Sequence, residues 1–126
     1  MKLDLHFIYK NKKFVIDFKS SFHSNEKGNT NRLLLVGTIY KNLEDNYKTL
    51  ILVRSEEDEN NHYLRRLKNS GIWEVFCGND TYEKIREYSG YNLKNWIEKN
   101  IDWEKDIDHN FYLYLKQNDL LKYLKW

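Results

Sequence analysis

Proline is absent from this chain of 126 residues, which also has five glycines and a single cysteine. One cysteine excludes an intramolecular disulfide and a four-cysteine zinc site, and it is most simply explained by a reducing compartment. The longest apolar runs, residues 33–37 and 50–53, are far too short to cross a bilayer, and the first residues alternate instead of forming the apolar core of a signal peptide. We therefore expect a soluble, cytoplasmic protein without a membrane segment.

Aromatic residues, by contrast, are plentiful, with ten Tyr, six Phe and four Trp. Side chains of this size bury enough apolar surface to exclude a disordered chain, and the length suits a single domain spanning residues 1–126. The charge is distributed unevenly, because residues 1–54 carry ten Lys or Arg against five Asp or Glu, and residues 55–126 carry eleven against fourteen. A basic half favours a polyanionic partner through counterion release.

Hydrophobic periodicity predicts an α/β fold in which strands and helices alternate after an opening hairpin. A continuous apolar run at residues 49–53 predicts a strand covered on both faces, as in a parallel or mixed sheet. Thr30 or Asn31 is placed to cap the first helix. For residues 110–126 the pattern fits either one long helix or a strand followed by a helix. The predicted strands are residues 3–9, 14–19, 49–53 and 72–76, and the predicted helices are residues 31–43, 60–69, 81–89 and 93–101.

The opening hairpin gathers polar side chains on one of its faces. A two-residue turn at residues 11–12 sets Asp4 directly opposite Lys19. Side chains alternate along each strand, so the apolar residues of both strands share one face, which we expect to be the core side. The other face then holds Asp4, His6, Asp17 and Lys19.

Two carboxylates and an amine at one end of a hairpin can support phosphoryl chemistry. Mg²⁺ binds one or two carboxylates together with water and a substrate phosphate. A lysine beside such an ion can orient a water molecule and neutralise charge that develops on phosphorus. The alternative is an ordinary exposed hairpin face with a cross-strand Asp–Lys pair, which contributes about a few tenths of a kcal/mol. His6 is either an accessory group near such a metal or a surface histidine.

The spacing of these residues resembles a known signature. Asp4, then twelve residues, then the triplet Asp-Phe-Lys at residues 17–19 is similar to the two-part motif of the PD-(D/E)XK nuclease superfamily. Residues 16–41 resemble the catalytic strand and following helix of some type II restriction endonucleases. Residues 67–78 resemble a later helix–strand unit of such enzymes, so the resemblance covers residues 3–78.

That resemblance implies a restriction-endonuclease-like mixed β-sheet flanked by helices, and Mg²⁺-dependent hydrolysis of phosphodiester bonds in double-stranded DNA. It also implies that Asp4, Asp17 and the backbone carbonyl of Phe18 bind the metal. Lys19 would position or activate the attacking water. Such enzymes are often dimers, which favours a homodimer. The family places a helix and a strand before the first acid, whereas three residues precede Asp4. We therefore expect a core without these elements. Either a longer chain, a partner or the segment at residues 102–126 fills their place, or the activity has been lost.

Two polar segments are expected to contact DNA. One is the hairpin tip, where lysines favour backbone phosphate, and the other is the loop and helix start after Lys19, whose side chains suit phosphate or base contacts. A solvated hairpin tip and a polar loop that caps a helix are the alternatives. Cys77 has no base at an interpretable spacing and is expected to be a buried thiol. The expected DNA-binding residues are Lys10, Lys12, Lys13, Ser21, His23, Lys27, Asn29, Asn31 and Arg32.

Other classes of function remain open on the sequence. The small size and the missing N-terminal elements also fit a non-catalytic α/β binding protein, such as a phage-borne inhibitor or an immunity protein, that retains a nuclease-like core. A third alternative is a DNA-binding module that keeps the basic half without the chemistry. Three observations distinguish these functions. Metal-dependent cleavage supports the nuclease, and a stoichiometric protein partner supports the non-catalytic binding protein. Salt-dependent DNA binding without cleavage supports the DNA-binding module.

Overall fold

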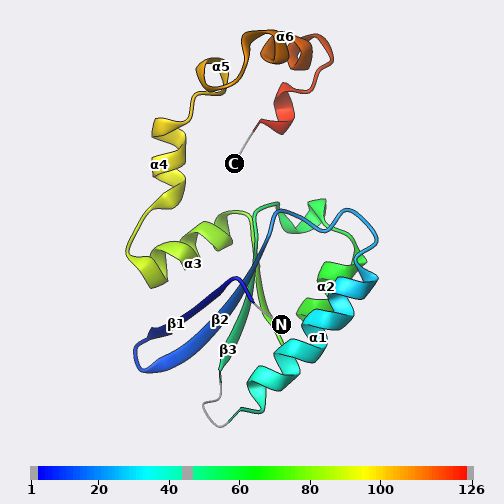
Figure 1. Cartoon of the computed structure of the whole chain (residues 1–126), viewed down its shortest axis with the longest axis vertical. Coiled ribbons are helices and arrows are strands. Elements are labelled where there is room, and N and C mark those ends of the chain that lie inside the picture. The colour runs from blue at the N-terminus through cyan, green and yellow to red at the C-terminus, as the bar shows by residue number, and fades with distance from the viewer. Residues whose placement is uncertain (1–2, 44–46, 125–126) are drawn as a thin grey trace. The chain divides into compact units, whose positions relative to one another are not determined.

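The computed structural model describes residues 3–43 and 47–124 of the chain (Figure 1). The chain divides into two compact units, Met1–Lys84 and Ile85–Trp126, which we call the N-terminal unit and the C-terminal unit. Residues 3–78 all fall within the N-terminal unit. Within the described ranges, no helix is both long enough and apolar enough to cross a membrane.

The N-terminal unit contains a four-stranded mixed sheet whose strand order follows the chain, β1-β2-β3-β4. β1 and β2 form an antiparallel hairpin, whereas β2 pairs with β3, and β3 with β4, in parallel. The predicted α/β class, with a mixed sheet that starts with a hairpin and is flanked by helices, is therefore confirmed. The strands are β1 (Leu5–Tyr9), β2 (Lys12–Lys19), β3 (Lys48–Val53) and β4 (Glu74–Cys77).

Helices connect the parallel strands and cover the sheet. α1 (Lys27–Lys41) links β2 to β3, and α1 begins at the end of the sheet where β2 ends (Figure 1). The short 3₁₀ turn η1 (Glu57–Glu59) and α2 (His62–Asn69) link β3 to β4. α1 and α2 pack against each other and lie on the same face of the sheet. α3 (Asn79–Ser89) follows β4.

The main core lies between the sheet and the two helices α1 and α2. The indole Nε1 of Trp73 donates across this core to the carbonyl oxygen of Leu33 at 2.9 Å. Gly37 of α1 permits the close approach, because a Cβ there would lie 2.5 Å from Cγ2 of Ile72 and 2.6 Å from Nε1 of Trp73. The sheet, α1, α2 and the segments next to them all contribute side chains to one apolar cluster. Its buried members are Leu3, Val15, Phe22, Leu33, Val36, Ile51, Val53, Leu64, Leu67 and Trp73.

The structure corrects the predicted hairpin register. The turn consists of Lys10 and Asn11, with φ values of 48° and 60°, instead of residues 11–12. Positive φ at both central residues is the mark of a type I′ turn, whose twist matches that of the flanking strands. The pairing is therefore shifted by two residues. Continuing the observed pairs by one residue beyond β1 sets Asp4 opposite position 17 instead of opposite Lys19.

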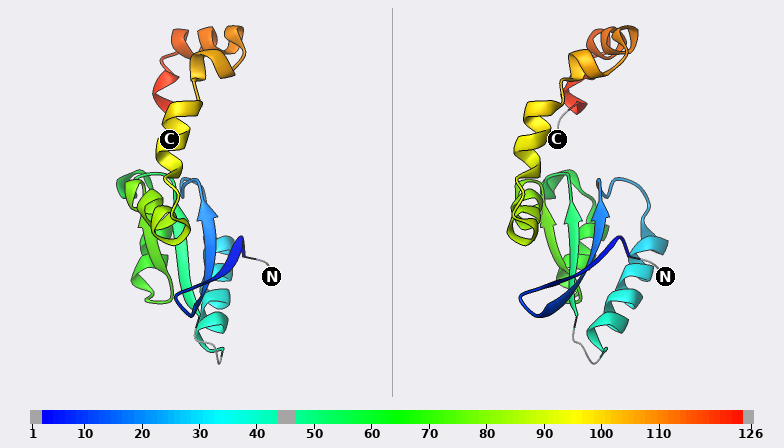
Figure 2. Two further views of the ribbon diagram at one scale, coloured as in Figure 1. Left: turned by 90° about the vertical axis from the view of Figure 1, so that its left-hand side faces the viewer. Right: turned by 60° about the vertical axis from the view of Figure 1, so that its left-hand side comes forward.

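The predicted core face is also wrong. The main core lies on the face of β2 that carries Val15 and Asp17, and the prediction put it on the opposite face. On that opposite face, Leu5 and Phe18 are 43% and 41% exposed. β2 is an interior strand, and α1 packs over one side of the sheet (Figure 2), so residues 14–17 are buried on both faces. Alternation along a strand could not show which face α1 would cover.

The start of α1 differs from the prediction as well. The helix begins at Lys27, four residues before the expected start at Asn31. Glu26 is its N-cap residue, and the carbonyl of Glu26 accepts a hydrogen bond from the N–H of Thr30 at 2.7 Å. Thr30 is fully buried inside the helix, so neither Thr30 nor Asn31 is the cap. The early start places the polar residues of this segment on a helix instead of in a loop.

The C-terminal unit consists of short helices. Asn92, Asp102 and Asp108 cap three of them, each accepting a hydrogen bond from a backbone N–H in the following turn. Ile97 and Leu115 are the two buried apolar side chains among the described residues of this unit. Both expectations for the tail are wrong over its described part, because a short helix and a separate 3₁₀ turn occur there. The elements are α4 (Leu93–Asn100), α5 (Trp103–Asp106), α6 (His109–Gln117) and η2 (Leu121–Tyr123).

Candidate functional site

Asp17 and Lys19 meet at the end of β2. Their side chains share a face because they are two residues apart on an extended strand. Nζ of Lys19 lies 3.1 Å from Oδ2 of Asp17. Asp17 is 3% exposed, although a carboxylate is among the groups that cost most to bury, and Lys19 supplies the compensating charge. The structure therefore brings two of the three predicted catalytic residues together as an ion pair with a buried carboxylate.

One oxygen of the Asp17 carboxylate accepts no hydrogen bond from the described residues. Its Oδ2 has no hydrogen-bond partner among the described residues, although the amine of Lys19 is near enough for charge pairing. Buried carboxylate oxygens are normally hydrogen-bonded, because an unsatisfied buried acceptor costs about 1–3 kcal/mol or more. This oxygen can therefore accept a further ligand, such as a cation or a water molecule.

Asp4, the third predicted catalytic residue, lies beside the backbone of β2. Its side chain is exposed, and its Oδ2 accepts a hydrogen bond from the N–H of Phe18 at 2.8 Å. In an extended strand, the N–H and C=O of one residue point to the same side, and those of the next residue point to the other. The carbonyl of Phe18 therefore points toward the side on which Asp4 lies. The carbonyl of Lys19 accordingly faces β3, where it accepts from the N–H of Arg54 at 2.9 Å.

Among the predicted metal ligands, Asp4 is hydrogen-bonded to the N–H of Phe18, and Asp17 precedes Phe18 in β2. Within the part of the chain that the structure describes, no group of three or more His, Cys, Asp or Glu side chains could hold a metal ion. A metal here would depend on the carboxylates of Asp4 and Asp17, completed by the Phe18 carbonyl and by water. Mg²⁺ accepts such a set, since it binds through one or two carboxylates and keeps several waters. The oxygen of Asp17 without a hydrogen-bond partner fits this donor chemistry.

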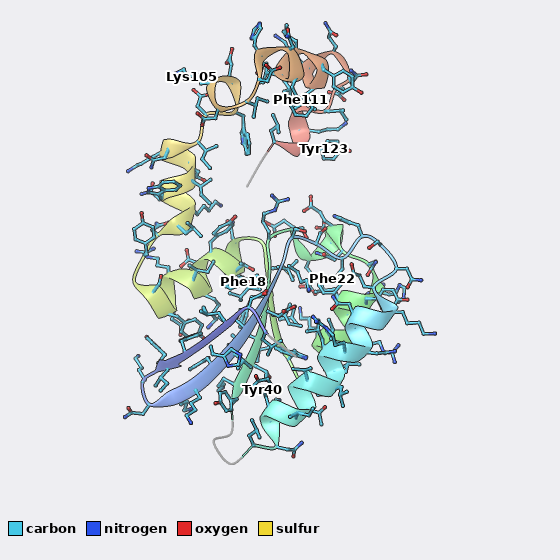
Figure 3. The ribbon with its side chains drawn as sticks, in the orientation of Figure 1. Phe18, Phe22, Tyr40, Lys105, Phe111 and Tyr123 are labelled. Atoms are coloured by element: carbon cyan, nitrogen blue, oxygen red, sulfur yellow. The ribbon has the colours of Figure 1, made fainter. Side chains whose placement is uncertain are left out.

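The loop between β2 and α1 is fastened to the segment before α2. Oδ1 of Asn60 accepts from the N–H of Phe22 at 2.7 Å, and the N–H of Asn61 donates to the carbonyl of Phe22 at 2.8 Å. Phe22 itself is fully buried in the core (Figure 3). Ser21 is half-buried and His23 is exposed, one on each side of this anchor. Asn60 was not among the predicted residues; its signal in the sequence is the pair of asparagines before a helix, of which Asn61 caps α2.

The predicted DNA-binding residues of α1 differ in their surroundings. Lys27 and Asn31 are exposed. Asn29 is half-buried, and its Nδ2 donates to Oε2 of Glu26 at 3.2 Å. Arg32 is half-buried, and its Nε is a buried donor without a hydrogen-bond partner among the described residues. A guanidinium donor of this kind suits an anionic ligand such as phosphate.

The hairpin tip lies at the other end of β2. Lys10 and Lys12 are exposed and Lys13 is half-buried. Lys13 and Lys19 are separated by six residues on the same strand, which corresponds to about 20 Å at the usual rise of about 3.3 Å per residue. The structure therefore divides the predicted DNA-binding residues into two groups, one at each end of β2.

Cys77 ends β4 and is half-buried. Burial, together with a smaller contribution from the negative charge of Glu57, raises the pKa of its thiol to about 11. Lys68, whose Nζ lies 2.7 Å from Oε1 of Glu57, acts in the opposite direction on this pKa with a smaller effect. The thiol therefore stays protonated at neutral pH and is a poor nucleophile. The expectation of a buried thiol is met in part, because Cys77 is half-buried.

Comparison of the chain with protein-family models, with curated proteins and with solved structures finds no match. The fold and the site define a class by themselves: a mixed α/β protein with a buried, ion-paired carboxylate at the carboxyl end of an interior strand. Ligands of open α/β sheets commonly bind at the carboxyl ends of the parallel strands. Asp17, Lys19 and the anchored loop after β2 all lie at that end of the sheet.

Proposed function

We propose that the protein is a Mg²⁺-dependent endonuclease of the restriction type, which hydrolyses phosphodiester bonds in double-stranded DNA. One observation carries the proposal. Asp17 is 3% exposed, and its Oδ2 lies 3.1 Å from Nζ of Lys19 but accepts no hydrogen bond from the described residues. Burying a carboxylate costs on the order of several kcal/mol unless it is compensated, so a fold that keeps one at a strand end favours a function for it.

Each group has a distinct role in this proposal. Asp17, Asp4 and the carbonyl of Phe18 would hold Mg²⁺, which supplies charge neutralisation at the scissile phosphate when it is bound. The ammonium of Lys19 would orient the attacking water and stabilise the negative charge that develops on the phosphoryl oxygens. The hydrogen bond from the N–H of Phe18 would hold the carboxylate of Asp4 in place relative to β2.

Duplex DNA is the proposed substrate because the first part of the chain is basic. Residues 1–54 carry ten Lys or Arg against five Asp or Glu, and contacts between such side chains and phosphates give salt-dependent affinity. A homodimer would bring two such sites to the two strands of one duplex. The proposed compartment is the cytoplasm, where a single reduced cysteine is ordinary.

Cleavage of supercoiled plasmid tests the proposal. The wild-type protein with Mg²⁺ should nick or linearise the plasmid, and EDTA should abolish the reaction. Asp17→Asn keeps the shape of the side chain and removes its charge, whereas Lys19→Gln removes the amine. Each should lower the cleavage rate by at least about 100-fold, which is the usual effect of removing one group that stabilises developing charge.

The pair of Asp119 and Lys122 in the C-terminal unit supplies matched controls. Its Nζ to Oδ2 distance is also 3.1 Å, but both side chains are largely exposed. Asp119 has φ of 56°, a conformation that Asn tolerates well. Asp119→Asn and Lys122→Gln should therefore cleave at the wild-type rate. Equal cleavage rates for the wild type and a folded Asp17→Asn variant would remove Asp17 from the proposed catalytic groups.

DNA binding without cleavage is the second candidate function. It is favoured by the ion pair itself, because the amine of Lys19 already compensates the carboxylate of Asp17 that would otherwise bind a metal. A wild-type protein that binds duplex DNA with a steep salt dependence and never cleaves it would support this function. A protein that neither binds nor cleaves DNA, and forms a stoichiometric complex with another protein, would favour the non-catalytic binding protein.

A further inference from the structure

The hairpin tip carries lysines that are ordered by aromatic rings and that lie away from the Asp17–Lys19 pair. Nζ of Lys10 lies 5.2 Å from the ring centroid of Tyr9, and Nζ of Lys13 lies 5.7 Å from that of Tyr47. A cation held over a ring has less side-chain freedom to lose when it binds an anion. We call this group, completed by the exposed Lys12, the tip cluster: Tyr9, Lys10, Lys12, Lys13 and Tyr47.

The tip cluster is joined to α1 and β1 through further rings. Tyr47 and Tyr40 form an edge-to-face pair with ring centroids 5.2 Å apart. Oη of Tyr40 lies 3.4 Å from Nε2 of His6, and Tyr40 extends from α1 toward the strands (Figure 3). These contacts fix the base of the hairpin tip against the rest of the N-terminal unit. Its position relative to the end of β2 is therefore set by the fold.

Acidic side chains are scarce along the hairpin. In residues 1–16 the sequence has one acid, Asp4, against four lysines. Lys48, at the start of β3, is paired with Glu74 at 3.2 Å. Lys10 and Lys12 of the tip cluster are exposed. Glu44 and Asp45 lie outside the described residues. β1 forms one edge of the sheet, so a polyanion that follows this edge meets the tip cluster at one end and Asp4 at the other.

The spacing between the two ends corresponds to a length of DNA. Lys13 and Lys19 lie near the two ends of β2 and are about 20 Å apart along the strand. Duplex DNA rises about 3.4 Å per base pair, so this distance corresponds to about six base pairs. We propose that the tip cluster binds the DNA backbone about six base pairs to one side of the phosphate at the Asp17–Lys19 site. This inference rests on the proposed function and adds the length of flanking duplex that the substrate must have.

The salt dependence of DNA binding tests the inference. The tip variant Lys10→Gln/Lys12→Gln/Lys13→Gln removes three charges and keeps most of each side chain. Fluorescence anisotropy with a labelled duplex of about 20 base pairs, at salt concentrations from about 50 to 200 mM, gives the slope of log K against log salt. The slope of the tip variant should be shallower than that of the wild type by about 2.7, so the ratio of the wild-type affinity to the variant affinity should fall by about 40-fold between about 50 and 200 mM salt.

A control variant separates this contact from a loss of net charge. Lys99→Gln/Lys105→Gln/Lys116→Gln removes three exposed lysines from the C-terminal unit, so its net charge equals that of the tip variant. The control should keep the wild-type slope. Circular dichroism of all three proteins should be the same, because the substituted lysines do not belong to the core.

The positions of cleavage near DNA ends supply a second measurement. The wild-type protein should not cleave within about six base pairs of an end on the side where the tip cluster would bind, and the tip variant should lose this restriction. If the wild type and the tip variant have equal slopes and equal cleavage patterns, the inference is overturned and the proposed function stands. If the wild type neither binds nor cleaves duplex DNA, the proposed function is overturned, and the inference with it.

Discussion

Gly37 lies where α1 packs closely against Ile72 and Trp73, with no space for a larger side chain. A Cβ at this position would lie 2.5 Å from Cγ2 of Ile72 and 2.6 Å from Nε1 of Trp73. Alanine would gain about 1 kcal/mol of helix propensity, but it would push α1 away from Trp73 and strain the hydrogen bond from Trp73 to Leu33. We expect Gly37→Ala to lower the free energy of unfolding by about 1–3 kcal/mol, seen as a lower urea midpoint at an unchanged m-value.

Gly28, in the first turn of the same helix, is the control for this substitution. Nothing lies within 4 Å of the position that its Cβ would take. Gly28→Ala should therefore raise the free energy of unfolding by up to about 1 kcal/mol. Effects of the same sign and size at both glycines would contradict the close packing of α1 on Trp73.

Cys77 provides a pH-dependent prediction at the same scale. Its pKa is raised from an ordinary value of 9.0 to about 11, chiefly by burial. The folded protein therefore holds this proton more tightly than the unfolded chain does. The resulting stability is complete below about pH 9 and is lost as the pH rises to about 11. At pH 8 we expect alkylation of the native thiol to be about 100-fold slower than that of the unfolded protein. Equal alkylation rates for the two forms would contradict the raised pKa.

Among the elements, the hairpin turn determines where Asp4 meets β2. A type I′ turn favours Asn followed by Gly, and this chain has Lys10 and Asn11 there. Asn11→Gly should therefore stabilise the protein by about a few tenths of a kcal/mol, up to about 1. Lys12→Gly should destabilise it by about 0.5–1 kcal/mol, because Lys12 begins β2. Urea unfolding of the two variants measures both effects, and a stabilising Lys12→Gly would instead indicate a turn at residues 11–12.

The order of strands and helices could be predicted, because each long element has a clear hydrophobic period and polar boundaries. The register of the hairpin could not. Its tip, residues 10–13, lacks the glycine that usually marks a type I′ turn, and a shift of two residues leaves every side chain on its original face. The core face could not be predicted either, since β2 has Phe14 and Ile16 on one face and Val15 on the other, and only the position of α1 decides between them.

The candidate site was predictable in its residue types and not in its environment. That Asp17 and Lys19 share a face follows from the period of a strand. The burial of Asp17 depends on the helix packed over that face, which the residues around Asp17 do not encode. The anchoring of the loop is a non-local effect too, because Phe22 and Asn60 are 38 residues apart in the chain.

At the scale of the whole molecule, the two units differ in how many apolar side chains they bury. The N-terminal unit has a cluster of fully buried side chains drawn from the sheet, α1 and α2. In the C-terminal unit, Ile97 and Leu115 are the buried apolar side chains of the described residues, and Phe111 and Tyr123 are exposed (Figure 3). A segment of this size with so few buried side chains has little free energy to oppose local opening.

Hydrogen exchange should report this difference. We expect the backbone amides in the middle of β2 and in β3 to exchange slowest, at the rate of global unfolding, because residues 14–17 and 49–53 are buried. Amides of α4 and α6 should exchange at least about 100-fold faster than these, through local opening of the C-terminal unit. Mass spectrometry of peptides from the labelled full-length protein measures both regions in one sample. Equal protection in the two regions would mean that the chain unfolds as one cooperative unit.

The strand order of the sheet also bears on how the protein is made on the ribosome. Each strand pairs with the strand that immediately precedes it in the chain, so its neighbour has already been synthesised when it emerges. A nascent chain can therefore build the sheet outward from the hairpin, and no later segment has to insert between strands already paired. Because domains generally fold as units during synthesis, the N-terminal unit can fold before the C-terminal unit has left the exit tunnel.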